Sequence, residues 1–161
     1  MVLAAWCLAL VALVALVAAC SDAGAGSRTG VSPGGQPVKL DQVRGEATVE
    51  VDVFSGRPTP TFRLSAAEVS TLATKLSALA PAPAGAIANP LGYRGFVVEL
   101  VTASGPMTVR VQNGTVEVAD VAAATTSRLQ DSDRGVERWL FDLSHDRLPA
   151  EVTAIVADQL G

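Results

Sequence analysis

The chain has 161 residues, is 49% hydrophobic and 4% aromatic, and carries a formal net charge of −4 at pH 7. Because the charges are spread along the chain without a basic patch, nucleic acid is not an expected partner. A single histidine and two cysteines do not supply the usual ligand set of a zinc site. No phosphate loop or dinucleotide fingerprint occurs, so neither a metal nor a cofactor is expected.

The first feature along the chain is an apolar run at residues 2–19, and every acidic and basic residue lies beyond Cys20. A secretory signal has an apolar core followed by small residues at its cleavage site. The sequence Val17-Ala18-Ala19-Cys20 resembles the cleavage box of bacterial lipoprotein signal peptides, which reads aliphatic, small, small, cysteine. The resemblance implies that residues 1–19 are a signal peptide and that the Cys20 thiol is acylated, for example with palmitate.

Such an anchor would place the protein at the cell membrane or outer membrane, lipid-anchored and facing the extracytoplasmic side. Two or more acyl chains attach a protein stably, because each buried CH₂ contributes about 0.8 kcal/mol. The Lys or Arg that usually precedes the apolar core is missing, so an uncleaved membrane anchor is the alternative. A helix of about 18 residues spans roughly 27 Å, just enough for a bilayer core.

Residues 20–45 are predicted to be a linker that starts at the acylated cysteine. The stretch 21–37 consists mostly of Gly, Ser, Ala and Pro and has almost nothing apolar to bury. A random coil running to Gly45 spans about 25–30 Å on average. The linker would therefore hold the domain near the membrane but not against it, with Val38, Leu40 and Val43 as the residues that could pack on the domain.

Residues 46–161 are predicted to form one domain, which begins with a strand. Over 47–54 valines alternate with acidic residues, which indicates a strand with one buried and one solvated side. The two prolines and the glycine within 55–60 predict a rigid turn, and residues 61–64 return to an extended form.

A helix is predicted to follow Ser65. Ser65 and Glu68 have the spacing of a capping box, and Leu64 and Val69 have the spacing of a hydrophobic staple. Two prolines end the helix and open a loop over 80–90. The predicted buried stripe of the helix consists of Val69, Leu72, Ala73, Leu76 and Leu79.

Three strands are predicted next, over residues 96–102, 107–112 and 115–120. Asn113-Gly114 is a strong signal for a two-residue type I′ hairpin turn. This turn places Arg110 opposite Glu117, and a four-residue turn at 103–106 would place Glu99 opposite Arg110. The two turns together put valines and leucines on one face of the sheet and charged pairs on the other.

The remainder is predicted to be a loop over 119–133 and two helices over 134–144 and 150–160. Pro149 suits the first turn of the last helix. This order of elements predicts an α+β domain with a small, mainly antiparallel four-stranded sheet and helices packed on one face.

His145 is the only histidine, so any Ser–His–Asp chemistry would have to use it between Ser144 and Asp146. Nothing like a nucleophile elbow is present, and a solvated histidine at a helix C-terminus is the simpler interpretation. Asp131 and Asp133 lack the rest of a calcium loop and are expected to start a helix instead. The domain is therefore expected to be non-enzymatic.

Two polar loops flanked by glycine contain an arginine: Ser55-Gly56-Arg57 and Tyr93-Arg94-Gly95. If they lay together, Arg57 and Arg94 could hold a carboxylate or phosphate through bidentate hydrogen bonds, with Tyr93 beside them. In the alternative, the arginines satisfy loop carbonyls or pair with acidic side chains. Arg57, Tyr93 and Arg94 are the candidate ligand-binding residues.

Three segments of the chain form a recognisable set, namely FSGRPTPTF at 54–62, LGYRG at 91–95 and ERWL at 137–140. The set is similar to a group of small bacterial proteins whose pattern reads FSGRPNP-x-W, LGYRG and ERWL. The chain departs from this pattern at Thr59 and Phe62, where the group has Asn and Trp. The resemblance covers about residues 46–161 and implies no particular activity, so it assigns no functional residue.

Three functions remain open from the sequence. The first is a lipid-anchored domain of the cell envelope that binds an envelope protein or a small anionic ligand. The second is an envelope hydrolase or transferase that uses His145. The third is a structural protein of envelope assembly.

Overall fold

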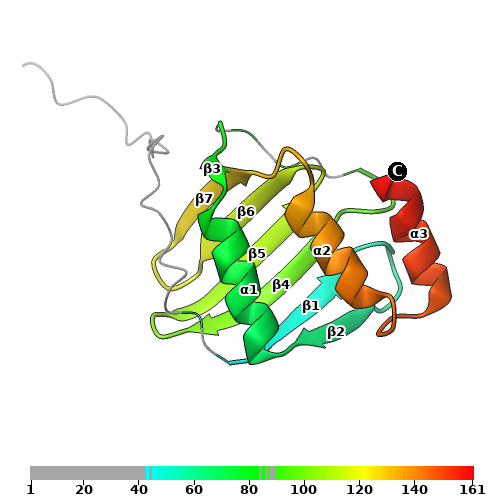
Figure 1. The fold of residues 1–161 in the computed structure, drawn as a ribbon, viewed down its shortest axis with the longest axis horizontal. Coiled ribbons are helices and arrows are strands. Elements are labelled where there is room, and N and C mark those ends of the chain that lie inside the picture. The colour runs from blue at the N-terminus through cyan, green and yellow to red at the C-terminus, as the bar shows by residue number, and fades with distance from the viewer. Residues whose placement is uncertain (1–42, 44, 84, 86, 88–89) are drawn as a thin grey trace, which may run out of the picture. The chain divides into compact units, whose positions relative to one another are not determined.

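The computed structural model describes Val43 and residues 45–83, 85, 87 and 90–161. The predictions for residues 1–42, including the acylation of Cys20, the signal peptide and most of the linker, lie outside these residues. The described part is an α+β domain in which helices cover a β-sheet (Figure 1).

Among the described residues, seven strands form one antiparallel sheet in the order β2-β1-β4-β5-β6-β7-β3. Its strands are β1 (Ala47–Val51), β2 (Thr61–Leu64), β3 (Ala80–Pro81), β4 (Phe96–Thr102), β5 (Gly105–Gln112), β6 (Thr115–Asp120) and β7 (Thr125–Gln130). The helices are α1 (Ala66–Ser77), α2 (Gly135–Ser144) and α3 (Ala150–Leu160). Helices α1 and α2 lie across one face of the sheet, and α3 lies beside α2 (Figure 1).

The α+β class and the antiparallel sheet are confirmed, but the prediction of four strands is wrong. Strands β3 and β7 lie where the sequence predicts loops, over 80–90 and 119–133. Strand β7 carries one large apolar residue, Leu129, and lies near the edge of the sheet, where it needs little apolar alternation to pair. Its partner β3 has only two residues, too few for any periodic signal.

The predicted register is confirmed for one hairpin and wrong for the other. Between β5 and β6, Arg110 lies opposite Glu117 as expected. Between β4 and β5, Glu99 lies opposite Thr108 instead of Arg110, because the turn contains two residues, 103–104, and not four. A slip of two residues leaves every side chain on its predicted face, since side chains alternate with a period of two.

The core lies between the sheet and the helices. Helix α1 starts with the predicted capping box, in which Ser65 and Glu68 satisfy each other's backbone N–H groups. The predicted stripe of α1 faces the sheet (Figure 1), with Val69, Leu72 and Leu76 nearly fully buried. The sheet side of the core is formed by Val49, Val51, Phe96, Val98, Leu100, Met107, Val109, Val111, Val116 and Val118.

The opposite side of the sheet, here called the open face, is polar and is not covered by α1 or α2 (Figure 1). Register and strand alternation place its side chains in rows that cross the strands. Most of them are half-buried or exposed. The open face includes Glu50, Asp52, Val97, Glu99, Val101, Thr108, Arg110, Gln112, Thr115, Glu117, Arg128 and Gln130.

Candidate functional site

The three motif segments, which are far apart in the sequence, meet at one end of the sheet. The LGYRG loop runs beside the end of β1, where the backbone N–H of Arg94 donates to the Asp52 carbonyl at 2.7 Å. The N–H of Asp52 donates in turn to the Gly95 carbonyl at 3.0 Å. The FSGRP segment continues directly from this strand, so the two arginine loops are neighbours.

The guanidinium of Arg94 forms an ion pair with the carboxylate of Asp52 and also lies 3.4 Å from the carbonyl oxygen of Phe54. The hydrogen bond to Asp52 raises the pKa of Arg94. A second guanidinium, that of Arg110, lies 3.6 Å from the other oxygen of the same carboxylate. Two cations therefore share one anion, and the group carries one excess positive charge.

Arg57 lies in the FSGRP segment, three residues after Phe54. Its guanidinium is 3.9 Å from the centre of the Phe54 ring and 3.5 Å from the carboxylate of Glu151 on α3. Both side chains of this ion pair are well exposed, so it contributes at most about 1 kcal/mol. Arg57 and Arg94 thus both contact Phe54, as a shared site would require, but each also has a carboxylate partner.

Tyr93 does not join the two arginines; its side chain enters the core. Its hydroxyl donates a 2.7 Å hydrogen bond to the carboxylate of Glu137, which is 0% exposed. The ring meets Phe96 edge-on, with 6.2 Å between centroids. Burial, together with the negative charge of Glu137, raises the pKa of Tyr93 well above its ordinary value. Tyr93 therefore joins the LGYRG loop to the ERWL segment of α2.

The other partner of Glu137 is Arg134, whose Nε donates to the carboxylate at 2.9 Å. The backbone of Arg134 is left-handed, with φ of 53°, and its Nη1 donates to the carbonyl of Gln159 at the end of α3. The hydrogen bond to Glu137 raises the pKa of Arg134. This pair compensates the buried carboxylate, which would otherwise be costly.

The expectation that Asp131 starts a helix is met by direct capping. Its carboxylate accepts hydrogen bonds from the backbone N–H groups of Gly135 at 2.9 Å and Val136 at 3.0 Å. A carboxylate at this position also interacts favourably with the positive end of the helix dipole. Asp131 is therefore a capping residue of α2.

Gln112 is a polar residue of this region that the sequence analysis did not single out. It is 2% exposed, and its amide oxygen and nitrogen have no hydrogen-bond partner among the described residues. A Cβ at the adjacent Gly95, which has φ of +93°, would lie 2.1 Å from the Val111 carbonyl oxygen and 2.9 Å from the Gln112 Cβ. The sequence does not predict that Gln112 is buried, because it lies between the apolar Val111 and the polar Asn113 of the turn. The burial follows only from the position of this strand in the sheet, beside Gly95.

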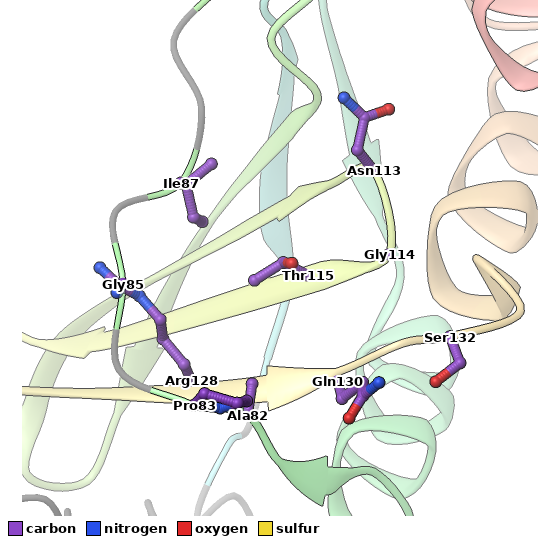
Figure 2. A pocket seen from close by; sticks show the side chains of 10 residues that line it. All are labelled: Ala82, Pro83, Gly85, Ile87, Asn113, Gly114, Thr115, Arg128, Gln130 and Ser132. Atoms are coloured by element: carbon purple, nitrogen blue, oxygen red, sulfur yellow. The ribbon is translucent and has the colours of Figure 1, made fainter.

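A hollow of about 460 Å³ lies next to this region on the open face. Figure 2 shows strand residues Thr115, Arg128 and Gln130 between two walls. One wall is the segment that includes Ala82, Pro83, Gly85 and Ile87, and the other contains Asn113, Gly114 and Ser132. Its volume is within the range of about 300–1,000 Å³ that is typical of small-ligand sites.

Arg128 is the one cation among the described residues that line the hollow, and it is already paired. Its Nε and Nη2 both donate to the same oxygen of Glu117, at 3.0 and 2.7 Å. The hollow therefore offers hydroxyl and amide groups more readily than a free positive charge. Of the predicted ligand-binding residues, none lines it.

His145 lies at the C-terminal end of α2 and is exposed. Its ring contacts Phe141 at 4.4 Å between centroids, and His145 does not line the hollow. The neighbouring Ser144 is 0% exposed, and its hydroxyl donates to the Phe141 carbonyl at 2.7 Å. The exposed position of His145 at the end of α2 fits the simpler interpretation of a solvated histidine at a helix C-terminus.

Within the described ranges, no three His, Cys, Asp or Glu side chains are grouped so that they could hold a metal ion. None of the helices in this part of the chain is both long enough and apolar enough to cross a bilayer. Comparison of the chain with protein-family models, curated proteins and solved structures found no match.

Proposed function

We propose that the chain is a lipid-anchored protein of the bacterial cell envelope whose folded domain binds a partner and does not catalyse a reaction. The observation that carries this proposal is the sequence Val17-Ala18-Ala19-Cys20 at the end of an uncharged apolar run. The change to a charged and Gly-rich composition directly after Cys20 supports it, because an anchor followed by a tether needs this boundary.

Two features of the domain support a binding role. The hollow beside Thr115 presents uncharged hydrogen-bonding groups, which suit a polar group of an envelope protein or a small ligand. The group formed by Asp52, Arg94 and Arg110 has one excess positive charge, and it supports the anionic ligand as a second candidate.

The anchor is tested by growing cells with radiolabelled palmitate. The native chain should incorporate label and sediment with membranes, and Cys20→Ser should do neither. The matched control is Cys7→Ser, since Cys7 lies within the segment that is removed and should not affect labelling. Equal labelling and sedimentation of Cys20→Ser and the native chain would contradict the proposal. A finished protein that still contains residues 1–19 would support the uncleaved anchor instead.

The binding role is tested by crosslinking in membranes followed by identification of the captured partner. Thr115→Arg places a long side chain into the hollow and should abolish capture. Thr71→Arg, at an exposed position of α1 that does not line the hollow, is the matched control. Loss of capture in Arg57→Ala/Arg94→Ala, with Thr115→Arg unaffected, would favour the anionic ligand. Capture that survives both variants would contradict both surfaces.

A further inference from the structure

Two hairpin turns at one end of the sheet form a single uncharged surface that is mostly apolar. The β4–β5 turn and the β6–β7 turn lie side by side at the end opposite to the Asn113-Gly114 turn (Figure 1). The N–H of Val121 donates to the carbonyl of Pro106 at 3.2 Å, and a Cβ at Gly105 would lie 3.0 Å from that of Ala122. We call residues 101–106 and 121–126 together the double tip.

We propose that the double tip rests on the bilayer to which the chain is anchored. The inference depends on the proposed lipid anchor and adds to it the face of the domain that touches the lipid. It also revises the expectation that the linker keeps the domain away from the membrane, because the average span of a coil does not prevent closer contact.

The exposure of the double tip is the first argument. Val101 is 68% exposed and Val121 is 58% exposed, and both are among the few large apolar side chains that the described domain leaves in water. They flank Pro106, which lies opposite Val101 in the β4–β5 ladder. The β6–β7 turn itself reads Val-Ala-Ala-Ala and is exposed along its length, although turns usually favour Gly, Asn, Asp or Ser.

Its charge is the second argument. Neither 101–106 nor 121–126 contains a Lys, Arg, Asp or Glu, although the chain as a whole has a net charge of −4. Anionic lipids repel a negatively charged protein surface, and this repulsion falls off within a Debye length. The residues of the double tip therefore add no charge of their own; the nearest carboxylate, that of Asp120 directly before Val121, accepts a hydrogen bond from the N–H of Ala123.

The hydrogen bonds within the two turns are the third argument. The hydroxyl of Thr102 accepts from the N–H of Ser104 at 3.2 Å and lies 2.9 Å from the carbonyl of Gly105, to which it donates. In the other turn, the N–H of Ala123 donates to the carboxylate of Asp120 at 2.9 Å. Polar groups that are already paired cost less to remove from water, so these turns can enter the interfacial layer at a reduced cost.

The position of the linker is the fourth argument, because it selects lipid over other occupants. Val43, the first described residue, forms an antiparallel bridge with Thr102, the residue next to Val101. The chain that leads back to Cys20 therefore leaves the domain beside the double tip. Tethering converts a weak contact into an intramolecular one at high effective concentration, so a few exposed apolar side chains suffice. The motif end and the hollow would then face away from the lipid.

The test uses the full chain, isolated from membranes and placed in vesicles of phosphatidylethanolamine and phosphatidylglycerol that contain a nitroxide-labelled lipid. Val121→Cys carries a fluorophore at the double tip, and Ser132→Cys carries it at the opposite end, where Ser132 is exposed. With Cys7 removed and Cys20 acylated, the introduced cysteine is the only free thiol. We expect strong quenching by the nitroxide lipid at position 121 and little at position 132.

Each other outcome overturns the inference. If the chain stays with the vesicles but position 121 is not quenched, the anchor holds and the contact with lipid fails. If position 121 is shielded from aqueous iodide but not quenched by the lipid, the double tip binds protein, a second copy included. If the chain does not stay with the vesicles, both the proposed anchor and the proposed contact with lipid are contradicted.

A charged variant provides the second measurement. With the fluorophore at Ala103→Cys, the changes Val101→Glu and Val121→Glu should remove most of the quenching, because they add charge to an exposed surface without touching the core. The matched change Ala154→Glu/Ala157→Glu adds the same charge to exposed positions of α3, outside the double tip. Quenching that survives Val101→Glu/Val121→Glu would also overturn the inference.

Discussion

The hydroxyl of Tyr93 donates a 2.7 Å hydrogen bond to the fully buried carboxylate of Glu137, and so connects the LGYRG loop to helix α2. Tyr93→Phe removes the donor and leaves the carboxylate with Arg134. Hydrogen bonds to charged groups contribute about 1.5–3 kcal/mol, and we expect the free energy of unfolding to fall by this amount. Urea denaturation followed by circular dichroism gives the value. In Glu137→Gln, the same Tyr93→Phe change should cost much less, because the charge that strengthens the bond is gone.

The same hydrogen bond predicts a response to alkaline pH. The folded state raises the pKa of Tyr93 above its ordinary value of about 10, so the unfolded chain ionises first. Stability from this group is complete below pH 10 and is lost above it, at about 1.4 kcal/mol per pH unit. Tyr93 is the only tyrosine, so the tyrosinate absorbance should appear only together with unfolding. Its appearance near pH 10 in the folded protein would contradict the buried geometry, and Tyr93→Phe should lack this part of the pH slope.

Two glycines of the LGYRG loop give a matched pair of variants. Both have positive φ, of +96° at Gly92 and +93° at Gly95, but only Gly95 has backbone atoms where a Cβ would be placed. Gly92→Ala should cost about 1 kcal/mol of stability for its backbone conformation alone. Gly95→Ala adds a clash with the Val111 carbonyl, and we expect a loss of about 3 kcal/mol or more. Equal losses in thermal or urea unfolding would show that the loop can move away from β5.

Glu68 should make the domain sensitive to acid. A hydrogen bond from Arg147, at 2.5 Å, is the largest contribution that lowers the pKa of Glu68 from 4.5 to about 2. Because the folded pKa is lowered, the stabilisation is present above pH 4.5 and is lost as the pH falls from 4.5 towards 2. We expect it to be on the order of 1 kcal/mol, since both side chains are partly exposed to solvent.

The measurement for Glu68 compares unfolding of the native chain and Glu68→Gln across this pH range. Glutamine also suits a capping box, so the variant removes the charge and keeps the cap. The difference in the free energy of unfolding should be largest near neutral pH and should shrink towards pH 2. A difference that does not change with pH would mean that the ion pair with Arg147 contributes nothing in solution.

Gln112 should be replaceable by an apolar residue with a gain in stability. Its buried amide has no partner among the described residues, and an unsatisfied buried polar group costs about 1–3 kcal/mol. Gln112→Met keeps the length of the side chain and should raise the free energy of unfolding by about 1 kcal/mol. If the variant unfolds more readily in urea, the amide is paired in solution. Repeating the crosslinking experiment with Gln112→Met shows separately whether the amide also has a role in binding.

Only part of the candidate site could be predicted from the sequence. The sequence placed Arg57 and Arg94 in glycine-flanked loops, and the structure brings both to Phe54. The carboxylates that pair with them, Asp52 and Glu151, lie on β1 and on α3, and no local spacing indicates either contact. Tyr93 was expected beside the arginines, but its side chain enters the core because Glu137 provides a buried acceptor there.

Local chemistry determined the parts of the fold that depend on neighbouring residues. The capping box at Ser65, the Asn113-Gly114 turn and the bounds of β4, β6 and α3 follow from residues a few positions apart. Strands β3 and β7 pair at the far end of the sheet, where the ladder supplies hydrogen bonds whatever the apolar pattern. The meeting of the three motifs, the burial of Gln112 and the double tip likewise required the tertiary structure, because strand order and register bring together residues whose separation along the chain carries no signal.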